Sequence, residues 1–425
     1  MKNNLSVSGR LRSDGGAPFA YLALAGFVTI ICLTCFIFRS PAHWAQGTLG
    51  QRTELVRKSD ARFLTGSSTY GNDEYSYVAM AEAPFSHDYL VRRSPFSYRV
   101  VVPSAVWVLT HMGLSIFGGF SVMALIGCLL ACSSIYMILI DMGINKWVAT
   151  WSSSMFMLLP PVLDTLVDPA RVDPLAWGCM FFSWWAWRRS RYVLTCIALM
   201  IGILTHETAA LIIPCILLDA IAFRERKIMP AVVVSVAGVV PTLISMAAIG
   251  KSSSKVPLVH YVHTVALSQF HLIEHGKGII DITVFSFGMV IFMFPFAWKA
   301  FRDPRILVLA PIVFLSLCLI PISSDFGRVI VPSALVSLVA APMVLQRFAR
   351  QAMLAIVTWL AAGATALIRQ TGLFRWLGSG IADSVVVVLC ATVLTLAFQN
   401  RRGGEDAAGN AAAGRREAGA VTSST

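Results

Sequence analysis

Apolar runs recur along nearly the whole chain, and short polar segments separate them. Most of the runs are roughly 15–24 residues long, close to the length an α-helix needs to cross a bilayer. This pattern predicts an all-α polytopic membrane protein with about 12 transmembrane helices. The predicted crossings are Pro18–Phe38, Phe120–Ile140, Trp147–Leu166, Pro174–Trp187, Tyr192–Thr205, Thr208–Phe223, Met229–Ile249, Ile279–Trp298, Ile306–Ile322, Val329–Leu345, Ala352–Ile368 and Ser384–Phe398.

One further apolar segment, Val100–Gly113, is too short for a comfortable crossing. It has Pro103 near its start, and its roughly 14 residues would span only about 21 Å as a helix. We therefore expect an interfacial helix that closes a long outer loop over residues 39–117. An even number of crossings then leaves both chain ends in the cytoplasm.

The basic residues support this topology. The chain has a formal net charge of +12, but its arginines and lysines fall in short loops on alternate sides of the apolar runs, which is the positive-inside pattern. We expect a cytoplasmic N-terminal segment (1–17), a transmembrane domain (18–399) and a disordered cytoplasmic tail (400–425). Because the charge is spread over these loops and forms no single face, we expect no nucleic-acid partner.

Composition agrees with a membrane protein. Hydrophobic residues make up 56% of the chain and charged residues 13%, against about 25% charged in soluble domains. Pro18–Phe38 follows a short basic leader and lacks a small-residue cleavage site, which indicates an uncleaved anchor. All nine cysteines lie inside apolar runs, where they are expected to pack as small apolar residues.

With this topology, unusual polar residues collect on the outer side. Their convergence predicts an outward-facing polar site. The candidates are Asp73, Glu74 and Arg99 in the first outer loop, Asp173 in the second, His206 and Glu207 in the third, and Asp325 and Arg328 in the fifth; the fourth loop, 250–278, is rich in histidine.

Asp73 and Glu74 lie among tyrosines in Gly71–Tyr77. A carboxylate at the membrane boundary can act as a general base toward an acceptor hydroxyl or amine. It can also ligate a divalent metal such as Mg²⁺ or Mn²⁺. The plain alternative is an acid that caps a helix in a solvated loop.

Arginines follow the acidic pair at positions 92, 93 and 99. A guanidinium fork suits phosphate better than a lysine point charge does. Arg99 is the preferred phosphate-binding candidate because it begins the predicted interfacial helix. Ordinary headgroup contacts, or salt bridges to the loop acids, are the alternative for all three.

The second outer loop holds a dense set of charges, Asp164, Asp168, Arg171 and Asp173, between prolines. Acids at the membrane edge are costly and usually serve a purpose. They can supply a second site carboxylate or metal ligation, or Arg171 and Asp168 can form a structural pair.

His206 and Glu207 lie between two apolar runs. A buried glutamate without a partner would be held neutral, so we expect a partner such as His206, Arg171 or Arg328. The pair can recognise phosphate or sugar, or it can mark a helix start with Thr205 as N-cap. Asp325 and Arg328 can likewise form a structural pair, or they can present Arg328 to an anionic substrate.

Several of these segments resemble motifs of the GT-C superfamily, which comprises polytopic glycosyltransferases that use polyprenyl- or dolichyl-phosphate-linked sugars. The resemblance covers about residues 18–346. The segments are Asn72-Asp73-Glu74 with Tyr75 and Tyr77, Pro95-Phe96-Ser97-Tyr98-Arg99 with Pro103, Asp173-Pro174-Leu175-Ala176, Glu207-Thr208-Ala209-Ala210-Leu211, and Asp325 with Arg328 before Pro332.

The resemblance implies a GT-C-like fold, with a long first outer loop and interfacial helices, in a bacterial inner membrane. It implies transfer of a sugar from a polyprenyl-phosphate donor to a lipid or glycan acceptor, with Asp73 or Glu74 as base. The site would face the periplasm or exterior and be surrounded by membrane lipids. The superfamily includes metal-dependent and metal-independent members, so a need for Mg²⁺ or Mn²⁺ stays open.

Two other functions remain open on the sequence. A transporter or flippase of a lipid-linked or anionic substrate would place polar residues at mid-membrane depth along several spans. A non-catalytic scaffold would tolerate substitution of the outer charges. Walker A, GxGxxG and GxSxG motifs are absent from the sequence, which argues against nucleotide binding and serine hydrolase chemistry.

Overall fold

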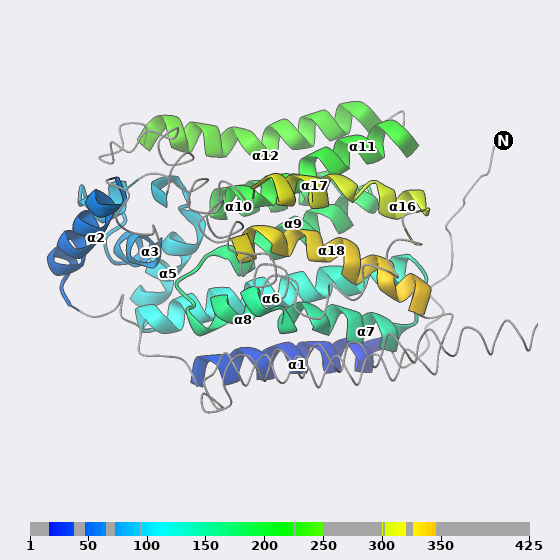
Figure 1. The fold of residues 1–425 in the computed structure, drawn as a ribbon, viewed down its shortest axis with the longest axis horizontal. Coiled ribbons are helices and arrows are strands. Elements are labelled where there is room, and N and C mark those ends of the chain that lie inside the picture. Colours follow the sequence, from blue (N-terminus) through cyan, green and yellow to red (C-terminus); the bar gives the residue numbers. More distant parts are fainter. Residues whose placement is uncertain are drawn as a thin grey trace, which may run out of the picture.

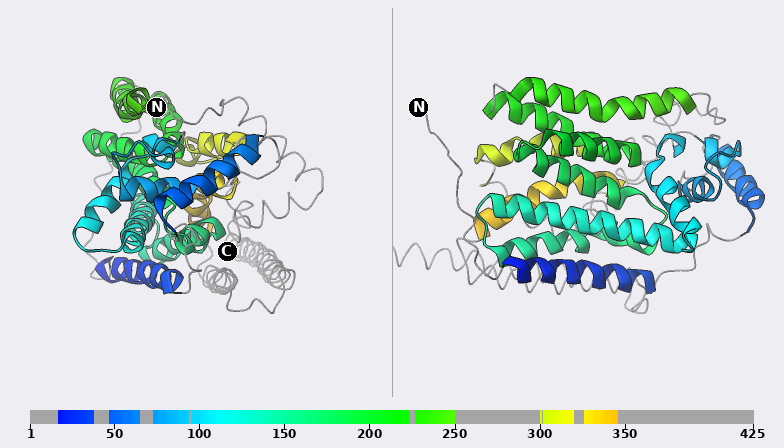
Figure 2. Two further views of the ribbon diagram at one scale, coloured as in Figure 1. Left: turned by 90° about the vertical axis from the view of Figure 1, so that its left-hand side faces the viewer. Right: turned by 180° about the vertical axis from the view of Figure 1, so that it is seen from behind.

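The computed structural model describes residues 17–37, 47–64, 73–93, 96–223, 227–249, 300, 302–319 and 326–345. Within these ranges all regular structure is α-helix or 3₁₀-helix. Long helices run side by side in a bundle, and shorter helices gather across one of its ends (Figures 1 and 2). The all-α prediction is confirmed for this part of the chain.

Many predicted crossings correspond to helices with nearly the predicted bounds. Among the described residues, α1, α6 and α12 are long and apolar enough to cross a membrane, judged by length and composition. The predicted number of twelve crossings is not confirmed. The corresponding helices are α1 (Ala17–Ile37), α6 (Ile116–Asp141), α9 (Asp173–Arg188), α10 (Tyr192–Thr205), α11 (Ile213–Phe223), α12 (Ile228–Ile249) and α18 (Phe326–Leu345).

Prolines divide two of the predicted crossings. The prediction of one helix over Trp147–Leu166 is wrong, because the segment forms α7 (Lys146–Met155), the 3₁₀ turn η3 (Phe156–Leu158) and α8 (Pro160–Val167). Leu159 has an extended backbone with ψ 127°, as expected for a residue that precedes a proline.

The predicted crossing that begins at Ile306 is also divided. It overlaps α16 (Pro304–Leu307), and most of its length lies in α17 (Ala310–Leu319), which has Pro311 in its first turn. Proline has no amide hydrogen to donate to the preceding turn, so a continuous helix loses a hydrogen bond there. The predicted crossings at 279–298, 352–368 and 384–398, the loop 250–278 and the tail 400–425 lie outside the described residues, as do residues 1–16 of the N-terminal segment.

Short helices from the first predicted outer loop form a layer across one end of the bundle, here called the site end (Figure 1). The layer comprises α2 (Leu49–Leu64), α3 (Asp73–Glu82), α4 (Tyr89–Arg92), the 3₁₀ turn η2 (Phe96–Tyr98) and α5 (Val101–His111). The last of these matches the predicted interfacial helix. Arg52 of α2 pairs with Glu82, and the Thr53 hydroxyl donates to Asp88 at 3.0 Å, so polar contacts attach α2 to the rest of the layer.

The opposite end of the bundle has its own ion pairs. Asp219 is fully buried in α11, where it pairs with Arg188 and accepts a hydrogen bond from the Trp187 indole at 2.9 Å. Arg189 pairs with Asp141 at the end of α6, in a more exposed position. These charges therefore lie at helix ends, apart from the site end.

Helices α6 and α9 cross closely enough that only glycine fits between them. A Cβ atom at Gly127 would lie 2.4 Å from the backbone nitrogen of Leu175, and one at Gly178 would lie 2.6 Å from the backbone oxygen of Gly127. Backbone atoms cannot move aside as a flexible side chain can. Since α9 begins at Asp173, this crossing also sets the place of a candidate site acid.

Replacing Gly127 by alanine is expected to destabilise the protein by about 1–3 kcal/mol, because the added methyl group overpacks the crossing. Thermal unfolding of the full chain in detergent measures the effect. Gly26→Ala in α1 is the matched control, since a Cβ there meets nothing within 4 Å. Equal melting temperatures for the two variants would contradict the close crossing.

Candidate functional site

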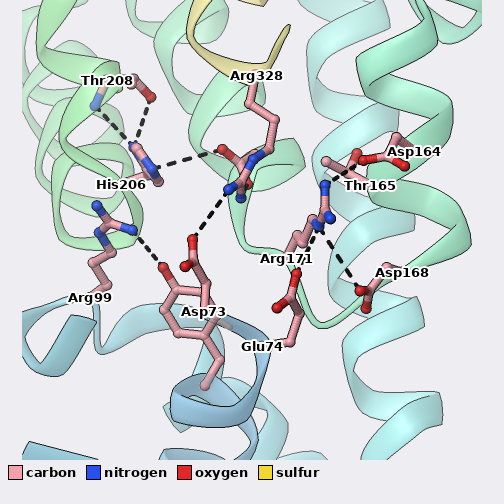
Figure 3. Close-up of polar contacts among 12 residues, drawn as sticks. Asp73, Glu74, Arg99, Asp164, Thr165, Asp168, Arg171, His206, Thr208 and Arg328 are labelled. Carbon is pink, nitrogen blue, oxygen red and sulfur yellow. Dashed lines mark hydrogen bonds and ion pairs between the residues drawn. The ribbon is translucent and has the colours of Figure 1, made fainter. Parts of the chain in front are cut away.

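The predicted site residues meet at the site end of the bundle, as Figure 3 shows for most of them. Asp73 and Glu74 open α3, Arg99 follows η2, Asp173 opens α9, and Arg328 lies in the first turn of α18. His206 and Glu207 join α10 to the 3₁₀ helix η4 (Glu207–Ile212). Asp325 lies outside the described residues.

Arg328 bridges two of the candidate acids. Its Nη1 donates to Asp173 Oδ2 at 3.0 Å, and its Nη2 donates to Asp73 Oδ2 at 3.2 Å. The Asp173 carboxylate is nearly inaccessible, whereas Asp73 and Arg328 retain slight exposure. One guanidinium group therefore ties α18 to the first turns of α3 and α9.

Glu74 is held by a different arginine. Arg171 Nε donates to Glu74 Oε1 at 3.0 Å, and Arg171 also pairs with Asp164. The expected structural partner Asp168 is more distant, with its Oδ2 at 4.0 Å from Nε. Successive residues of a helix point about 100° apart, so Asp73 and Glu74 face different cations.

Arg99 is the partner of Glu207, which was expected to pair with His206, Arg171 or Arg328. Arg99 Nε donates to Glu207 Oε2 at 2.9 Å, and Nη2 bonds to the other carboxylate oxygen. Such a bidentate arrangement fixes direction as well as distance. The Tyr98 hydroxyl also donates to Glu207 Oε2, at 3.1 Å, and Arg99 Nη1 donates to the Tyr77 hydroxyl at 2.6 Å.

His206 lies between the two groups of charges. Its Nε2 is 3.8 Å from Asp173 Oδ1, and its Nδ1 is 3.9 Å from Glu207 Oε2. The Thr208 amide donates to Nδ1 at 3.2 Å, which leaves the proton of a neutral ring on Nε2, toward Asp173. The expected N-cap at Thr205 is wrong: His206 caps η4, while the Thr205 hydroxyl bonds back to Ile201 within α10.

The surroundings of these groups set their protonation. The Glu207 side chain is 46% exposed. Partial desolvation of its carboxyl opposes ionisation, but the Arg99 guanidinium outweighs this effect and holds the pKa of that carboxyl well below its usual range. Burial, followed by the charge of Arg99, lowers the pKa of His206, so the ring is neutral at pH 7. Burial raises the pKa of Tyr98 to about 12, which keeps its hydroxyl protonated as a donor.

Acids outnumber cations in the assembled site. Arg99, Arg171 and Arg328 face six carboxylates, those of Asp73, Glu74, Asp164, Asp168, Asp173 and Glu207. Among the described residues, no three His, Cys, Asp or Glu side chains are grouped so as to hold a metal ion. The arrangement can bind and orient polar groups and can accept a proton at a carboxylate.

The contacts of several site residues could not be predicted from sequence spacing. Asp164 and Arg171 were noted as a local cluster, but their link to Glu74 spans 97 positions between Glu74 and Arg171. Tyr77 and Tyr98 belong to the motif segments, but their contacts with Arg99 and Glu207 were not predicted. Arg93, considered for phosphate, is instead fully buried and pairs with Asp60 of α2 at 2.7 Å.

The chain was compared with known proteins. No protein-family model matches it, and no curated protein matches it in sequence. One solved structure that aligns with it is the crystal structure of ArnT from Cupriavidus metallidurans bound to undecaprenyl phosphate, at 15% identity, over 82% of this chain and 76% of that one, with a TM-score of 0.45. At this level of similarity the alignment assigns neither a family nor an activity.

Arg328→Gln is expected to destabilise the protein by about 3 kcal/mol or more, because it leaves two poorly accessible carboxylates without their shared cation. Chemical or thermal unfolding in detergent measures the loss. Arg189→Gln is the matched control: it breaks the half-exposed pair with Asp141, and such pairs contribute about 0–1 kcal/mol. A loss at Arg328 no larger than at Arg189 would contradict the bridging role.

The pairing of Glu207 with Arg99 predicts that the stability of the folded protein depends on pH in the acidic range. Because the folded-state pKa of Glu207 is lowered, its stabilising contribution is present above the unfolded pKa of about 4.3 and is lost as the pH falls further. Melting temperatures between pH 6 and pH 3 should therefore fall less steeply for Glu207→Gln than for the wild type.

Glu54→Gln supplies the control for this pH series. Glu54 makes loose surface contacts with Arg57 and Lys58 of α2, at 3.9 and 3.4 Å. Its curve should run parallel to that of the wild type. If the Glu207→Gln curve is equally parallel, Arg99 does not stabilise the Glu207 carboxylate.

Proposed function

We propose that this protein is an integral membrane glycosyltransferase that moves a sugar from a polyprenyl-phosphate carrier to a lipid or glycan acceptor on the outer face of the membrane. The observation that carries the proposal is the bridge in which Arg328 holds Asp73 and Asp173 from separate helices. It lies beside the Arg99–Glu207 pair, at one end of an apolar bundle. The motif resemblance to GT-C transferases, found in the same residues, supports the same function.

The proposed reaction is a direct displacement at the anomeric carbon of the donor sugar. An acceptor hydroxyl forms the new bond to that carbon as the bond to the phosphate oxygen breaks, and the bonding electrons leave with the phosphate. The hydroxyl proton passes to a carboxylate oxygen of Asp73. The products are an inverted glycoside and polyprenyl phosphate.

Asp73 is the preferred base over Glu74. Both acids open α3, where the helix N-terminus favours their ionised forms. Glu74, however, shares Arg171 with Asp164, and in Figure 3 its carboxylate lies on the Arg171 side of the site. Asp73 lies on the Arg328 and His206 side of the site (Figure 3), where a donor phosphate and an acceptor would have to meet.

Arg328 is the better candidate to bind the donor phosphate. Its Nη1 bonds to Asp173 and its Nη2 bonds to Asp73, so a phosphate oxygen that replaces Asp73 at Nη2 leaves Arg328 held by Asp173. Arg99 is held by both oxygens of Glu207 and by Tyr77. We assign Arg99, Glu207 and His206 to shaping the site around the sugar.

A transporter or flippase is less well supported. A transport path needs polar groups at mid-membrane depth along several helices. In the described part of the chain, the ion pairs of the bundle gather at its two ends, with Asp219 and Asp141 paired at the end opposite the site.

Asp73→Asn is expected to lower the transfer rate by about 10²-fold or more, because the amide cannot accept the acceptor's proton. Glu74→Gln should have a smaller effect. Lipid-linked glycan profiling of cells that carry each variant measures both, with unconsumed donor accumulating when transfer stops.

Asp141→Asn, at the opposite end of the bundle, is the matched control and should retain activity at equal membrane abundance. Full activity in both Asp73→Asn and Glu74→Gln would remove the assignment. Donor trapped on the cytoplasmic leaflet would favour a flippase instead.

A further inference from the structure

The aromatic ring of Phe96 lies close to two guanidinium groups. The Cζ atom of Arg93 is 5.0 Å from the ring centroid, and that of Arg99 is 5.3 Å from it. The ring is almost completely buried. The Tyr77 ring meets it edge-on, with centroids 5.8 Å apart and planes at 87°, so Phe96 also packs against an aromatic neighbour.

Arg93 is anchored from α2. Its side chain has 0% exposure, and its Nη2 donates to Asp60 Oδ1 at 2.7 Å. The other oxygen of Asp60 accepts a hydrogen bond from the Tyr89 hydroxyl at 2.7 Å. A buried arginine requires such an acid, because an uncompensated charge away from water is strongly unfavourable.

These contacts form a continuous line from α2 to the site. Asp60 holds Arg93, Arg93 and Arg99 share the Phe96 ring, and Arg99 holds Glu207. Asp60 lies on α2, a helix that supplies none of the candidate site residues. At the other end of the line, Glu207 Oε2 lies 3.9 Å from His206 Nδ1, and His206 in turn neighbours Asp173.

We propose that Asp60, Arg93 and Phe96 are positioning residues that fix the Arg99 guanidinium, and through it Glu207, in the site. The consequence for transfer rests on the proposed function, whereas the mechanical link between α2 and Glu207 does not.

Electrostatics explains why Asp60 and Phe96 are both required to hold the two arginines in place. Two buried guanidinium groups close to one ring repel each other, and two features offset that repulsion. Each arginine has its own carboxylate, Asp60 or Glu207, and the negative face of the ring attracts cations most strongly where water is excluded. Without Asp60, Arg93 loses its salt bridge while it remains buried beside the same ring that holds Arg99.

A double-mutant cycle tests the link without relying on activity. Melting temperatures of the full chain in detergent are measured for Asp60→Asn, Glu207→Gln and the double variant. Asp60 binds Arg93 and Glu207 binds Arg99. If these two ion pairs were independent, the melting-temperature shifts of the two single variants would add up in the double variant. We expect the shift of the double variant to differ from the sum of the single shifts by about 2 °C or more.

A second cycle provides the control. Asp219→Asn removes a buried acid at the opposite end of the bundle, so its shift should add to that of Glu207→Gln within about 1 °C. If the cycle with Asp60 is as additive as this one, the positioning role is wrong.

Phe96 supplies a variant that leaves every charge in place, in case Asp60→Asn does not fold. Phe96→Leu keeps an apolar side chain but removes the aromatic face, whereas Phe96→Tyr retains it. The cycle of Phe96→Leu with Glu207→Gln should be non-additive, and Phe96→Tyr should restore additivity to within about 1 °C. Equal behaviour of the leucine and tyrosine variants would overturn the role of the ring.

The kinetics of transfer separate positioning from general destabilisation. Because Arg99 and Glu207 are assigned to shaping the site around the sugar, loosening Arg99 in Asp60→Asn should raise the KM for the donor more than it lowers kcat, which depends on Asp73. An unchanged KM in an active Asp60→Asn variant would count against the effect on the site. A non-additive cycle with no transfer activity in the wild type would leave the link standing and remove the proposed function.

Discussion

Charge compensation is the constraint on which the site end of this protein depends. The bundle is apolar, and a charged side chain that enters such surroundings requires a partner of opposite sign and hydrogen bonds for its remaining polar atoms. Arg328 between Asp73 and Asp173, Arg171 between Glu74 and Asp164, and Arg99 with Glu207 meet this requirement. Apart from the local Arg171–Asp164 pair, these contacts join elements that are distant in sequence, so satisfying the charges also assembles the site.

The helices determine where these charges can lie. Asp73 and Glu74 open α3, and Asp173 opens α9, positions at which the helix dipole favours an acid. The glycine contacts between α6 and α9 fix the position of Asp173 along the bundle, because the backbones of the two helices are in direct contact there. The layer of short helices then covers this end of the bundle, and Asp60 and Arg93 connect its outermost helix to Arg99 through Phe96. Rigid packing and paired charges thus act together on a few side chains.

Much of the helical arrangement could be predicted from the chain alone. The apolar run Tyr192–Thr205 forms α10 with those bounds, and the predicted interfacial segment contains α5. Apolar length is a local property, which explains this success. The prediction failed where local chemistry interrupts an apolar run: Pro160 and Pro161 separate α7 from α8, and a 3₁₀ helix precedes α11. The choice of twelve crossings depended on reading each run as one continuous helix.

The sequence by itself determined which residues are polar and at which helix ends they occur, because hydropathy and the positive-inside pattern are properties of short segments. That was enough to bring together Asp73, Glu74, Arg99, Asp173, His206, Glu207 and Arg328 as candidates. Only the tertiary structure decided which acid meets which arginine. Asp73 and Arg328 are 255 positions apart and Arg99 and Glu207 are 108 apart, and distances of a few ångströms between such residues follow from how the helices cross.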